Sequence, residues 1–177
     1  KSTGAISYPL YLSATFKHNG LNESTGYDYS RLQNPTREEA EKTIALLENG
    51  KEALAFSCGM AALTACVHLF KSGDHVILSE DLYGGTFRLF NEVYSVYNIE
   101  ASFIDTSDIN KVKDAIRDNT KGIIIETPSN PLMRVTDIKA ITDICKEKNI
   151  ISIVDNTFLT PYYQRPLELG ADIVVHS

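Results

Sequence analysis

The chain has 177 residues, of which 43% are hydrophobic and 23% charged, and its formal net charge at pH 7 is -6. These values are ordinary for a globular protein large enough to bury one sizeable core. The negative charge and the lack of any Lys/Arg run argue against a surface for nucleic acid or anionic membranes, since either needs clustered basic side chains.

The three cysteines are Cys58, Cys66 and Cys145, an odd number without C-x-x-C spacing. They indicate neither a disulfide framework nor a zinc site, so we expect no metal and a cytoplasmic, reducing location. The longest apolar runs, such as 150–154, are too short to span a bilayer. Residues 1–4 lack both an initiator Met and a signal-peptide core, so we expect the sequence to begin inside a longer chain.

Residues 1–33 are rich in Ser, Thr, Tyr, Asn and Gly and show little periodicity, which favours an extended N-terminal arm. A helix is predicted to start at Asn34, a good N-cap, with Pro35 at the first helical position. Apolar residues then recur at helical spacing, and Gly50 is the predicted stop.

Short apolar runs and amphipathic stretches alternate through the rest of the chain. Strands are predicted at 53–56, 75–78, 101–104, 122–125, 150–154 and 172–175, and apolar stripes at helical spacing within 87–97, 109–116 and 138–145. Such alternation, with strands apolar on both faces, predicts an α/β layer with a mostly parallel sheet. Ligands of such sheets collect where strands end and the next helices begin.

The segment SCGMAA at 57–62 follows one predicted strand and opens a helix. Its small residues let a phosphate approach the backbone, where the N–H groups of Gly59 and Met60 and the helix dipole would stabilise it. A tight turn without a ligand explains the same residues. Cys58 has no partner His or Asp to make it a nucleophile, and small-residue packing explains it better.

Asp155 stands at the end of the predicted strand 150–154, where a carboxylate can pair with a protonated pyridine nitrogen or simply cap a turn. Asn130 lies in a loop made rigid by two prolines, where it either hydrogen-bonds a ring hydroxyl or closes the turn. Tyr83, beside two glycines, can lay its ring on a flat cofactor or cover core residues.

In the arm, Tyr29 and Arg31 suit phosphate binding, although an exposed Arg usually faces only solvent. Each of these residues, taken separately, can be explained without a ligand. However, four of these segments follow four strands of one predicted sheet, where a single ligand could touch them all.

The order of these segments identifies a resemblance to a known family. The segments are YSR at 29–31 with NPT at 34–36, SCGMAA at 57–62, DLYGGT at 81–86, ETPSNP at 126–131, VDNT at 154–157 and VHS at 175–177. The chain resembles the trans-sulfuration, or Cys/Met-metabolism, enzymes that depend on pyridoxal 5'-phosphate (PLP), of the cystathionine γ-synthase and cystathionine β- or γ-lyase type. The resemblance implies a large domain of PLP fold type I, like that of aspartate aminotransferase.

The resemblance also implies roles for individual residues. Gly59 and Met60 would bind the phosphate through backbone N–H groups, and Ser177 would be a further phosphate ligand. Many relatives have serine where this chain has Cys58, so a hydroxyl contact there is in doubt. Tyr83 would stack on the pyridine ring and take part in proton transfer.

Asp155 would pair with the ring nitrogen, Thr157 would lie under the ring or near the phosphate, and Asn130 would contact the ring hydroxyl. Tyr29 and Arg31 resemble residues that reach the phosphate of a neighbouring subunit. The resemblance therefore implies a homodimer with shared sites, commonly assembled into a tetramer.

The implied reaction begins with PLP held by a lysine in a Schiff base, which an incoming amino acid displaces before its Cα proton is removed. The lysine of the family would come three residues after Ser177, and a C-terminal domain would supply an arginine for the substrate carboxylate. We therefore expect an arm at 1–33, an incomplete PLP-binding domain at 34–177, and a chain roughly twice this length.

Several functions remain open at this stage. The first is β- or γ-elimination of cystathionine or related L-amino acids; the second is γ-replacement on an O-acyl-homoserine, as in cystathionine γ-synthase or O-acetylhomoserine sulfhydrylase. Methionine γ-lyase is a third, which Gly85 disfavours because those enzymes tend to carry cysteine there. A non-catalytic chain with only an assembly role is an alternative from another class. A nucleotide-binding domain has little support, since no glycine-rich phosphate loop is present.

Overall fold

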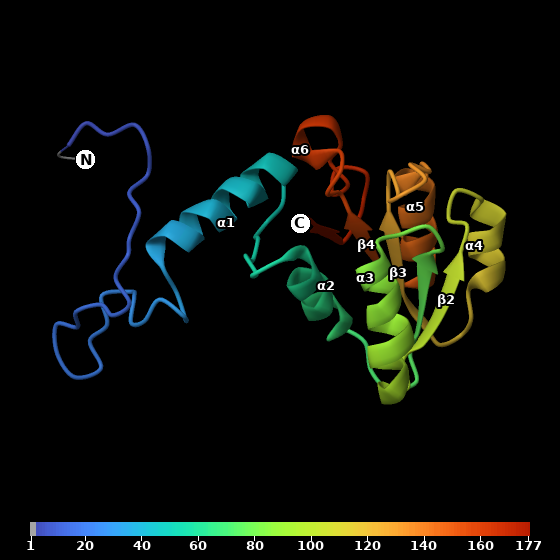
Figure 1. Ribbon diagram of the computed structural model, residues 1–177, viewed down its shortest axis with the longest axis horizontal. Coiled ribbons are helices and arrows are strands. Elements are labelled where there is room, and N and C mark those ends of the chain that lie inside the picture. The colour runs from blue at the N-terminus through green and yellow to red at the C-terminus, as the bar shows by residue number, and fades with distance from the viewer. Residues whose placement is uncertain (1–2) are drawn as a thin grey trace. The chain divides into compact units, whose positions relative to one another are not determined.

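The computed structural model describes residues 3–177, so the first two residues of the predicted arm lie outside it. The chain divides into two compact units after Ala55 (Figure 1). We call residues 3–55 the arm unit and residues 56–177 the sheet unit, and describe each by itself. The sequence placed the boundary at residues 33 and 34, but the helix that follows residue 34 groups with the arm.

In the arm unit, residues 3–33 form no helix or strand, only isolated antiparallel bridges that join Thr15 to Tyr29 and Gly20 to Glu23. Helix α1 spans Pro35–Glu48, and the side chain of Asn34 accepts a hydrogen bond from the backbone N–H of Thr36 at 2.8 Å. This confirms the predicted cap.

Helix α1 ends at Asn49, whose φ of 55° is left-handed and lets its N–H reach the last helical carbonyls. The predicted stop at Gly50 is therefore one residue late, because asparagine also adopts this conformation readily.

The sheet unit contains five parallel strands: β1 His75–Ser79, β2 Glu100–Ile104, β3 Thr120–Glu126, β4 Ile151–Asp155 and β5 Ile173–Val175. Their order across the sheet is β2-β1-β3-β4-β5. Five of the six predicted strands are therefore confirmed to within two residues at each end, as is the prediction of a mostly parallel sheet.

The sixth prediction, a strand at 53–56, is wrong. These residues are extended but pair with no strand of the described chain, and Leu54 is 75% exposed. An apolar run becomes a strand only when another strand offers its backbone groups for pairing, and a local pattern does not report that partner.

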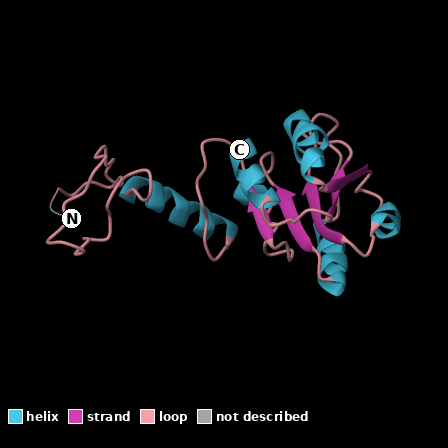
Figure 2. Ribbon diagram, turned by 90° about the horizontal axis from the view of Figure 1, so that it is seen from below, coloured by secondary structure: helices cyan, strands magenta, loops and turns pink. Residues whose placement is uncertain are grey.

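Helices cover both faces of the sheet (Figure 2). In chain order they are α2 Gly59–Val67, α3 Gly84–Arg88, a π-helix Leu89–Val93, a 3-10 helix Tyr94–Tyr97, α4 Ile109–Ala115, α5 Ile138–Lys148 and α6 Thr160–Tyr163. The stripe at 87–97 predicted one continuous helix, whereas the structure changes helix type twice there. A shift in turn size rotates successive side chains, so that Phe90 is buried while Val93 and Tyr97 stay exposed.

Alternate side chains of the strands build two cores, one on each face. In β1, Val76 and Leu78 pack with α2 and with Phe90 of the π-helix, whereas Ile77 points to the opposite face, toward α4 and α5. Every residue of β1 is buried, as expected for a strand covered on both sides.

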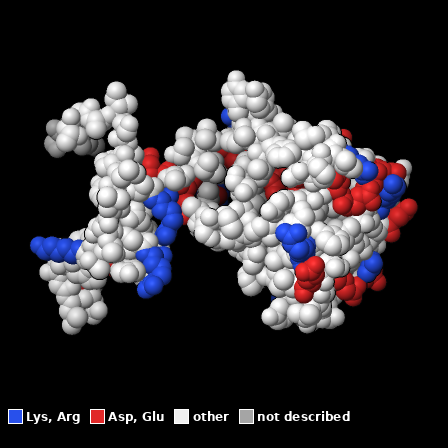
Figure 3. Space-filling model, in the orientation of Figure 1, with Lys and Arg blue, Asp and Glu red and all other residues white. Residues whose placement is uncertain are grey.

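On the face shown in Figure 3, Lys and Arg side chains of the sheet unit lie among Asp and Glu side chains and form no continuous basic patch. Within residues 3–177, every helix is too short or too polar to cross a lipid bilayer. In the same part of the chain, no cluster of His, Cys, Asp and Glu is arranged to hold a metal ion.

Candidate active site

A cavity of about 410 Å³ lies where the carboxyl ends of the strands meet the start of α2. Its lining includes seven of the nine residues predicted from the sequence: Gly59, Met60, Tyr83, Asn130, Asp155, Thr157 and Ser177. Residues from five separate segments thus face one space, as the rule for parallel sheets predicts.

The cavity lies beside the point where the strand order reverses. The chain runs from β1 outward to β2 and then returns to β3 on the other side of β1. The helices after β1 and β3 pack on opposite faces, so the loops diverge and leave a crevice between them.

The first turn of α2 contributes the wall formed by Cys58, Gly59 and Met60. Cys58 is the N-cap but its side chain makes no capping hydrogen bond. The first backbone N–H groups of a helix have no partner within it, which makes this end a site for anions. A Cβ at Gly59 would lie 2.6 Å from Cβ of Ser177 and 3.0 Å from its Cα, so only glycine lets α2 approach Ser177 this closely.

Asp155, Thr157 and Ser177 form one hydrogen-bonded group. Oδ1 of Asp155 accepts from the backbone N–H of Thr157 at 3.0 Å and from its hydroxyl at 2.6 Å. The hydroxyl oxygen of Thr157 in turn accepts from the backbone N–H of Ser177 at 3.0 Å. This arrangement fixes the orientation of the Asp155 carboxylate and joins the ends of β4 and β5.

Tyr83 immediately precedes α3, and its ring lies close to the backbone of Gly85. A Cβ at Gly85 would lie 2.5 Å from Cε1 of the Tyr83 ring and 3.0 Å from the Met60 sulfur. The absent side chain at Gly85 therefore makes room for the ring of Tyr83, a residue that is 48% exposed and lines the cavity.

Glu126, the last residue of β3, also lines the cavity and was not among the predicted site residues. Its Oε2 accepts from the backbone N–H of Tyr83 at 2.8 Å, and it is paired in register with Asp155 on β4. Burial raises the pKa of the Glu126 carboxyl, and Asp155 and Asp81 add to the rise, while the N–H groups of Tyr83 and Asn130 oppose it. Only its position after a strand, shared with Asp155, could have marked it.

Leu63, Thr86 and Phe158 also line the cavity and were not among the predicted site residues. Thr86 is buried and Phe158 is half exposed. None of these side chains carries a charge, and their place in the lining depends on the fold.

Tyr29 and Arg31 belong to the arm unit, whereas the residues that line the cavity all belong to the sheet unit. The Arg31 guanidinium carbon lies 5.0 Å from the centre of the Tyr29 ring, a cation–π contact. Their predicted role in a neighbouring subunit stays a prediction.

The cysteines have different surroundings. Cys58 is exposed at the cavity, whereas Cys145 is buried, and burial raises the pKa of the Cys145 thiol to about 12. A thiol with such a pKa is not a nucleophile at neutral pH.

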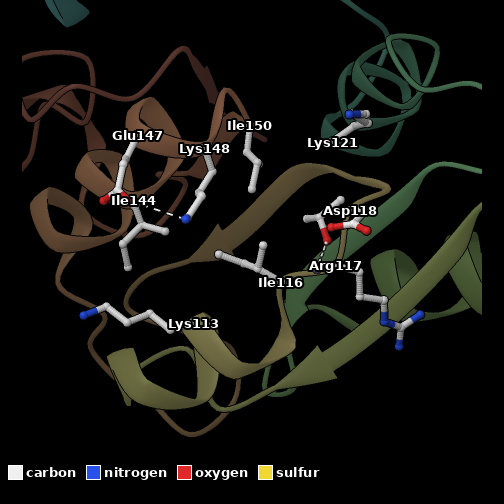
Figure 4. Close-up of a pocket in the computed structure, with 10 residues that line it drawn as sticks. Lys113, Ile116, Arg117, Asp118, Lys121, Ile144, Glu147, Lys148 and Ile150 are labelled. Carbon is white, nitrogen blue, oxygen red and sulfur yellow. Dashed lines mark hydrogen bonds and ion pairs between the residues drawn. The ribbon is translucent and has the colours of Figure 1, made fainter.

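A larger hollow of about 670 Å³ lies at the amino ends of β3 and β4, between α4 and α5 (Figure 4). Its basic side chains do not converge: Arg117 is held by Glu100 at 2.8 Å, outside the hollow, and Lys148 lies 3.4 Å from Glu147. The smaller cavity, where seven predicted residues meet, is therefore the candidate active site.

A profile described as Cys/Met metabolism PLP-dependent enzyme matches residues 1–177. The chain belongs to this family. It is 52% identical over 177 residues to cystathionine gamma-lyase of Bacillus subtilis (strain 168), covering 100% of this chain and 47% of the relative. It is 54% identical over 175 residues to cystathionine gamma-synthase/O-acetylhomoserine (thiol)-lyase of the same organism, covering 99% and 47%.

A crystal structure of cystathionine gamma-lyase from Lactobacillus plantarum complexed with L-serine matches the fold with a TM-score of 0.94. That match has 45% sequence identity and covers 99% of this chain and 46% of that one. The predicted family and its fold are confirmed. The chain spans about half the length of the curated relatives that it matches.

Proposed function

We propose that the full-length protein is a PLP-dependent enzyme that cleaves a carbon–sulfur bond of cystathionine or a related L-amino acid by β- or γ-elimination. The observation that carries this proposal is the cavity in which Asp155, Tyr83 and the start of α2 face one another. Family membership and the names of the relatives support it.

The described residues fit PLP at each of its polar ends. The backbone at Gly59 and Met60, with Ser177 beside it, offers N–H groups and a hydroxyl for the phosphate. The close approach of Gly59 to Ser177, which a Cβ would prevent, gives this cradle its shape.

Bound PLP would supply an electron-withdrawing ring that stabilises negative charge at the substrate Cα. Asp155 would hold the proton on the ring nitrogen and so keep the ring cationic. Because Thr157 occupies Oδ1 of Asp155, we assign the contact with the ring nitrogen to Oδ2. Asn130 would donate its side-chain amide to the ring hydroxyl.

Tyr83 would lay its ring along one face of the pyridine and exclude water from it. Its hydroxyl would hold a proton near the reacting carbon. The position of the ring against Gly85, in a residue that lines the cavity and is about half exposed, supports this assignment.

A second candidate function is γ-replacement on an O-acyl-homoserine. The relative named cystathionine gamma-synthase/O-acetylhomoserine (thiol)-lyase shares 54% identity with this chain, which is close to the 52% of the gamma-lyase. Both reactions begin with the same removal of the Cα proton, so the cavity described above suits either.

We further propose that Tyr29 and Arg31 complete the site of a partner subunit in a cytoplasmic homodimer, which pairs further into a tetramer. An exposed guanidinium stacked on a tyrosine ring suits a phosphate brought from outside the arm unit. The three cysteines, none in a disulfide, are consistent with a reducing compartment.

The purified full-length protein tests the proposal directly. We expect a yellow absorbance after PLP is added, bleached by borohydride, and release of pyruvate or 2-oxobutyrate from cystathionine. Pyruvate would indicate β-elimination and 2-oxobutyrate γ-elimination, whereas a thioether formed from O-acetylhomoserine and a thiol would indicate γ-replacement. A protein that stays colourless with PLP would contradict the proposal.

Replacing Asp155 with Ala tests the site within that protein. We expect turnover to fall by about 10³-fold or more, because the ring nitrogen loses the carboxylate that keeps it protonated. Asp143→Asn, which alters a carboxylate on the exposed face of α5, is the matched control and should leave turnover unchanged. Activity retained by the Asp155→Ala protein would remove the assigned role.

A further inference from the structure

We propose that Glu126 is a positioning residue, which holds Tyr83 at the cavity by tying the loop after β1 to the loop after β3. The inference rests on the proposed function only for the task given to the Tyr83 ring. The tie itself is a property of the sheet unit.

The strand order explains why a tie is needed at this point. β1 and β3 are hydrogen-bonded neighbours, with Leu78 opposite Ile124. Beyond these strands the chain turns to opposite faces, toward Phe90 of the π-helix after β1 and toward α5 after β3. The backbone pairing of the sheet therefore ends where the loops that line the cavity begin.

Side chains replace that pairing in both directions across the crevice. Glu126, at the end of β3, accepts from the backbone N–H of Tyr83 in the loop after β1. Asp81, in that same loop, accepts from the Ser129 hydroxyl and, at 3.1 Å, from the backbone N–H of Leu132 in the loop after β3. Each loop thus supplies one carboxylate to the other.

The contacts of Glu126 and Asp81 have different roles. Asp81 joins the loops outside the cavity lining, whereas Glu126 lies within the lining and holds the residue that carries the ring. Because the Tyr83 ring lies against Gly85, with Met60 beside it, a shift of the Tyr83 backbone moves the ring with it.

The surroundings of Glu126 argue for a specific role. Its carboxylate is partly buried and lies in register beside Asp155, so its negative charge is electrostatically unfavourable there. The hydrogen bonds from the N–H groups of Tyr83 and Asn130 offset this cost. Both donors belong to residues assigned to the cofactor, so one carboxylate orients two contacts.

Two substitutions of Glu126 distinguish the effect of side-chain length from the effect of charge. Glu126→Gln keeps an acceptor oxygen at the same reach but removes the charge, whereas Glu126→Asp keeps the charge on a side chain shorter by about 1.5 Å. The hydrogen bond from the Tyr83 N–H requires a side chain long enough to reach it. Glu126→Gln should therefore behave like the wild type, and Glu126→Asp should resemble Glu126→Ala. The opposite order would overturn the proposal, because it would show that the charge is what matters.

Hydrogen exchange of the Tyr83 amide in the full-length apoprotein measures the tie without PLP. We expect exchange about tenfold faster or more in the Asp and Ala variants and near the wild-type rate in Gln, since the side chain at position 126 no longer reaches the Tyr83 N–H only in the first two. Glu147→Gln, on α5 outside the cavity, is the control and should change nothing. Unchanged exchange in a folded Glu126→Ala protein would overturn the tie.

Turnover by the holoenzyme is the second readout. We expect kcat to fall about tenfold in the Asp and Ala variants with KM nearly unchanged, and Gln to restore it, because the ring of Tyr83 is displaced while the substrate contacts remain. Since Asp81 still joins the loops, these variants should keep the wild-type Tm. If the wild type shows no turnover, the proposed function fails, while the exchange experiment still decides the tie.

Discussion

At Gly59, hydrogen is the only side chain that the structure accommodates, because Ser177 occupies the place of a Cβ. Gly59→Ala should therefore push the first turn of α2 away from Ser177 and spoil the phosphate cradle. We expect the affinity of the full-length protein for PLP to fall about tenfold or more, the equivalent of one lost charge-assisted hydrogen bond, in an absorbance titration.

Gly84→Ala provides the control for this substitution. Gly84 is also the first residue of a helix, but the nearest atom to its added Cβ is Nη1 of Arg88 at 3.7 Å, an ordinary contact. Its affinity for PLP should match the wild type. Equal losses in both variants would show that the effect comes from the added methyl group in general and not from the contact with Ser177.

Single residues of the site also show what could be predicted from the sequence. Asp155 was predicted because a charged residue directly after an apolar run is visible in the sequence, and Tyr83 because it stands beside two glycines. Glu126 stands in the same position but was missed, since its partner Tyr83 is 43 residues away and meets it only when β1 and β3 pair. A function that depends on non-local pairing leaves no local signal.

Among the elements, the strands were predicted best, because burial on both faces produces unbroken apolar runs. The segment 53–56 has the same composition but no partner strand among the described residues, and the sheet order likewise depends on pairing that no single run encodes. The stripe at 87–97 correctly predicted helical structure, although a period of 3.6 residues does not show where a π turn is inserted.

At the amino ends of the strands, His75 joins three elements and gives a prediction on pH. Its Nδ1 lies 2.8 Å from the Thr120 hydroxyl on β3 and its Nε2 lies 2.9 Å from the Ser102 hydroxyl on β2. Burial lowers the pKa of His75, Arg117 lowers it further, and Glu100 opposes them. The folded protein therefore resists protonation at this imidazole more than the unfolded chain does.

The unfolded chain binds this proton near the ordinary pKa of 6.5, whereas the folded protein binds it only at lower pH. The contribution of His75 to the free energy of unfolding is therefore fully present above pH 6.5 and is lost as the pH falls below that value. We expect the urea midpoint of unfolding to fall between about pH 7.5 and about pH 5.5, and to fall less in His75→Gln, which cannot take up the proton. His68→Gln, at an exposed position, should keep the wild-type pH dependence. Parallel curves for the wild type and His75→Gln would contradict the assignment.

For the whole molecule, the predicted site residues are distributed over both units. The sheet unit contains all seven predicted residues that meet at the cavity, and the arm unit contains the other two, Tyr29 and Arg31. An arm that serves the site of its own chain and an arm that serves a partner require the same residues, so only an experiment on assembled subunits separates them.

Mixed dimers make that separation. Arg31→Ala removes the proposed phosphate contact and Asp155→Ala removes the ring-nitrogen contact, so each variant alone should have little activity. If Arg31 acts in the partner's site, a mixed dimer collects both defects in one site and leaves the other intact. Random mixing in equal amounts should then restore about a quarter of the wild-type activity.

Coexpression with two affinity tags, followed by purification through both, removes assemblies that contain only one variant and should raise the activity above this quarter. The value approaches half of the wild type when the doubly tagged species is purified as a dimer, because one of its two sites is intact. Arg31→Ala carrying both tags is the control and should regain none. If each arm serves its own chain, every site of the mixed dimer carries one defect and no activity returns. That result would place Arg31 in its own subunit's site and remove the reason for a shared one.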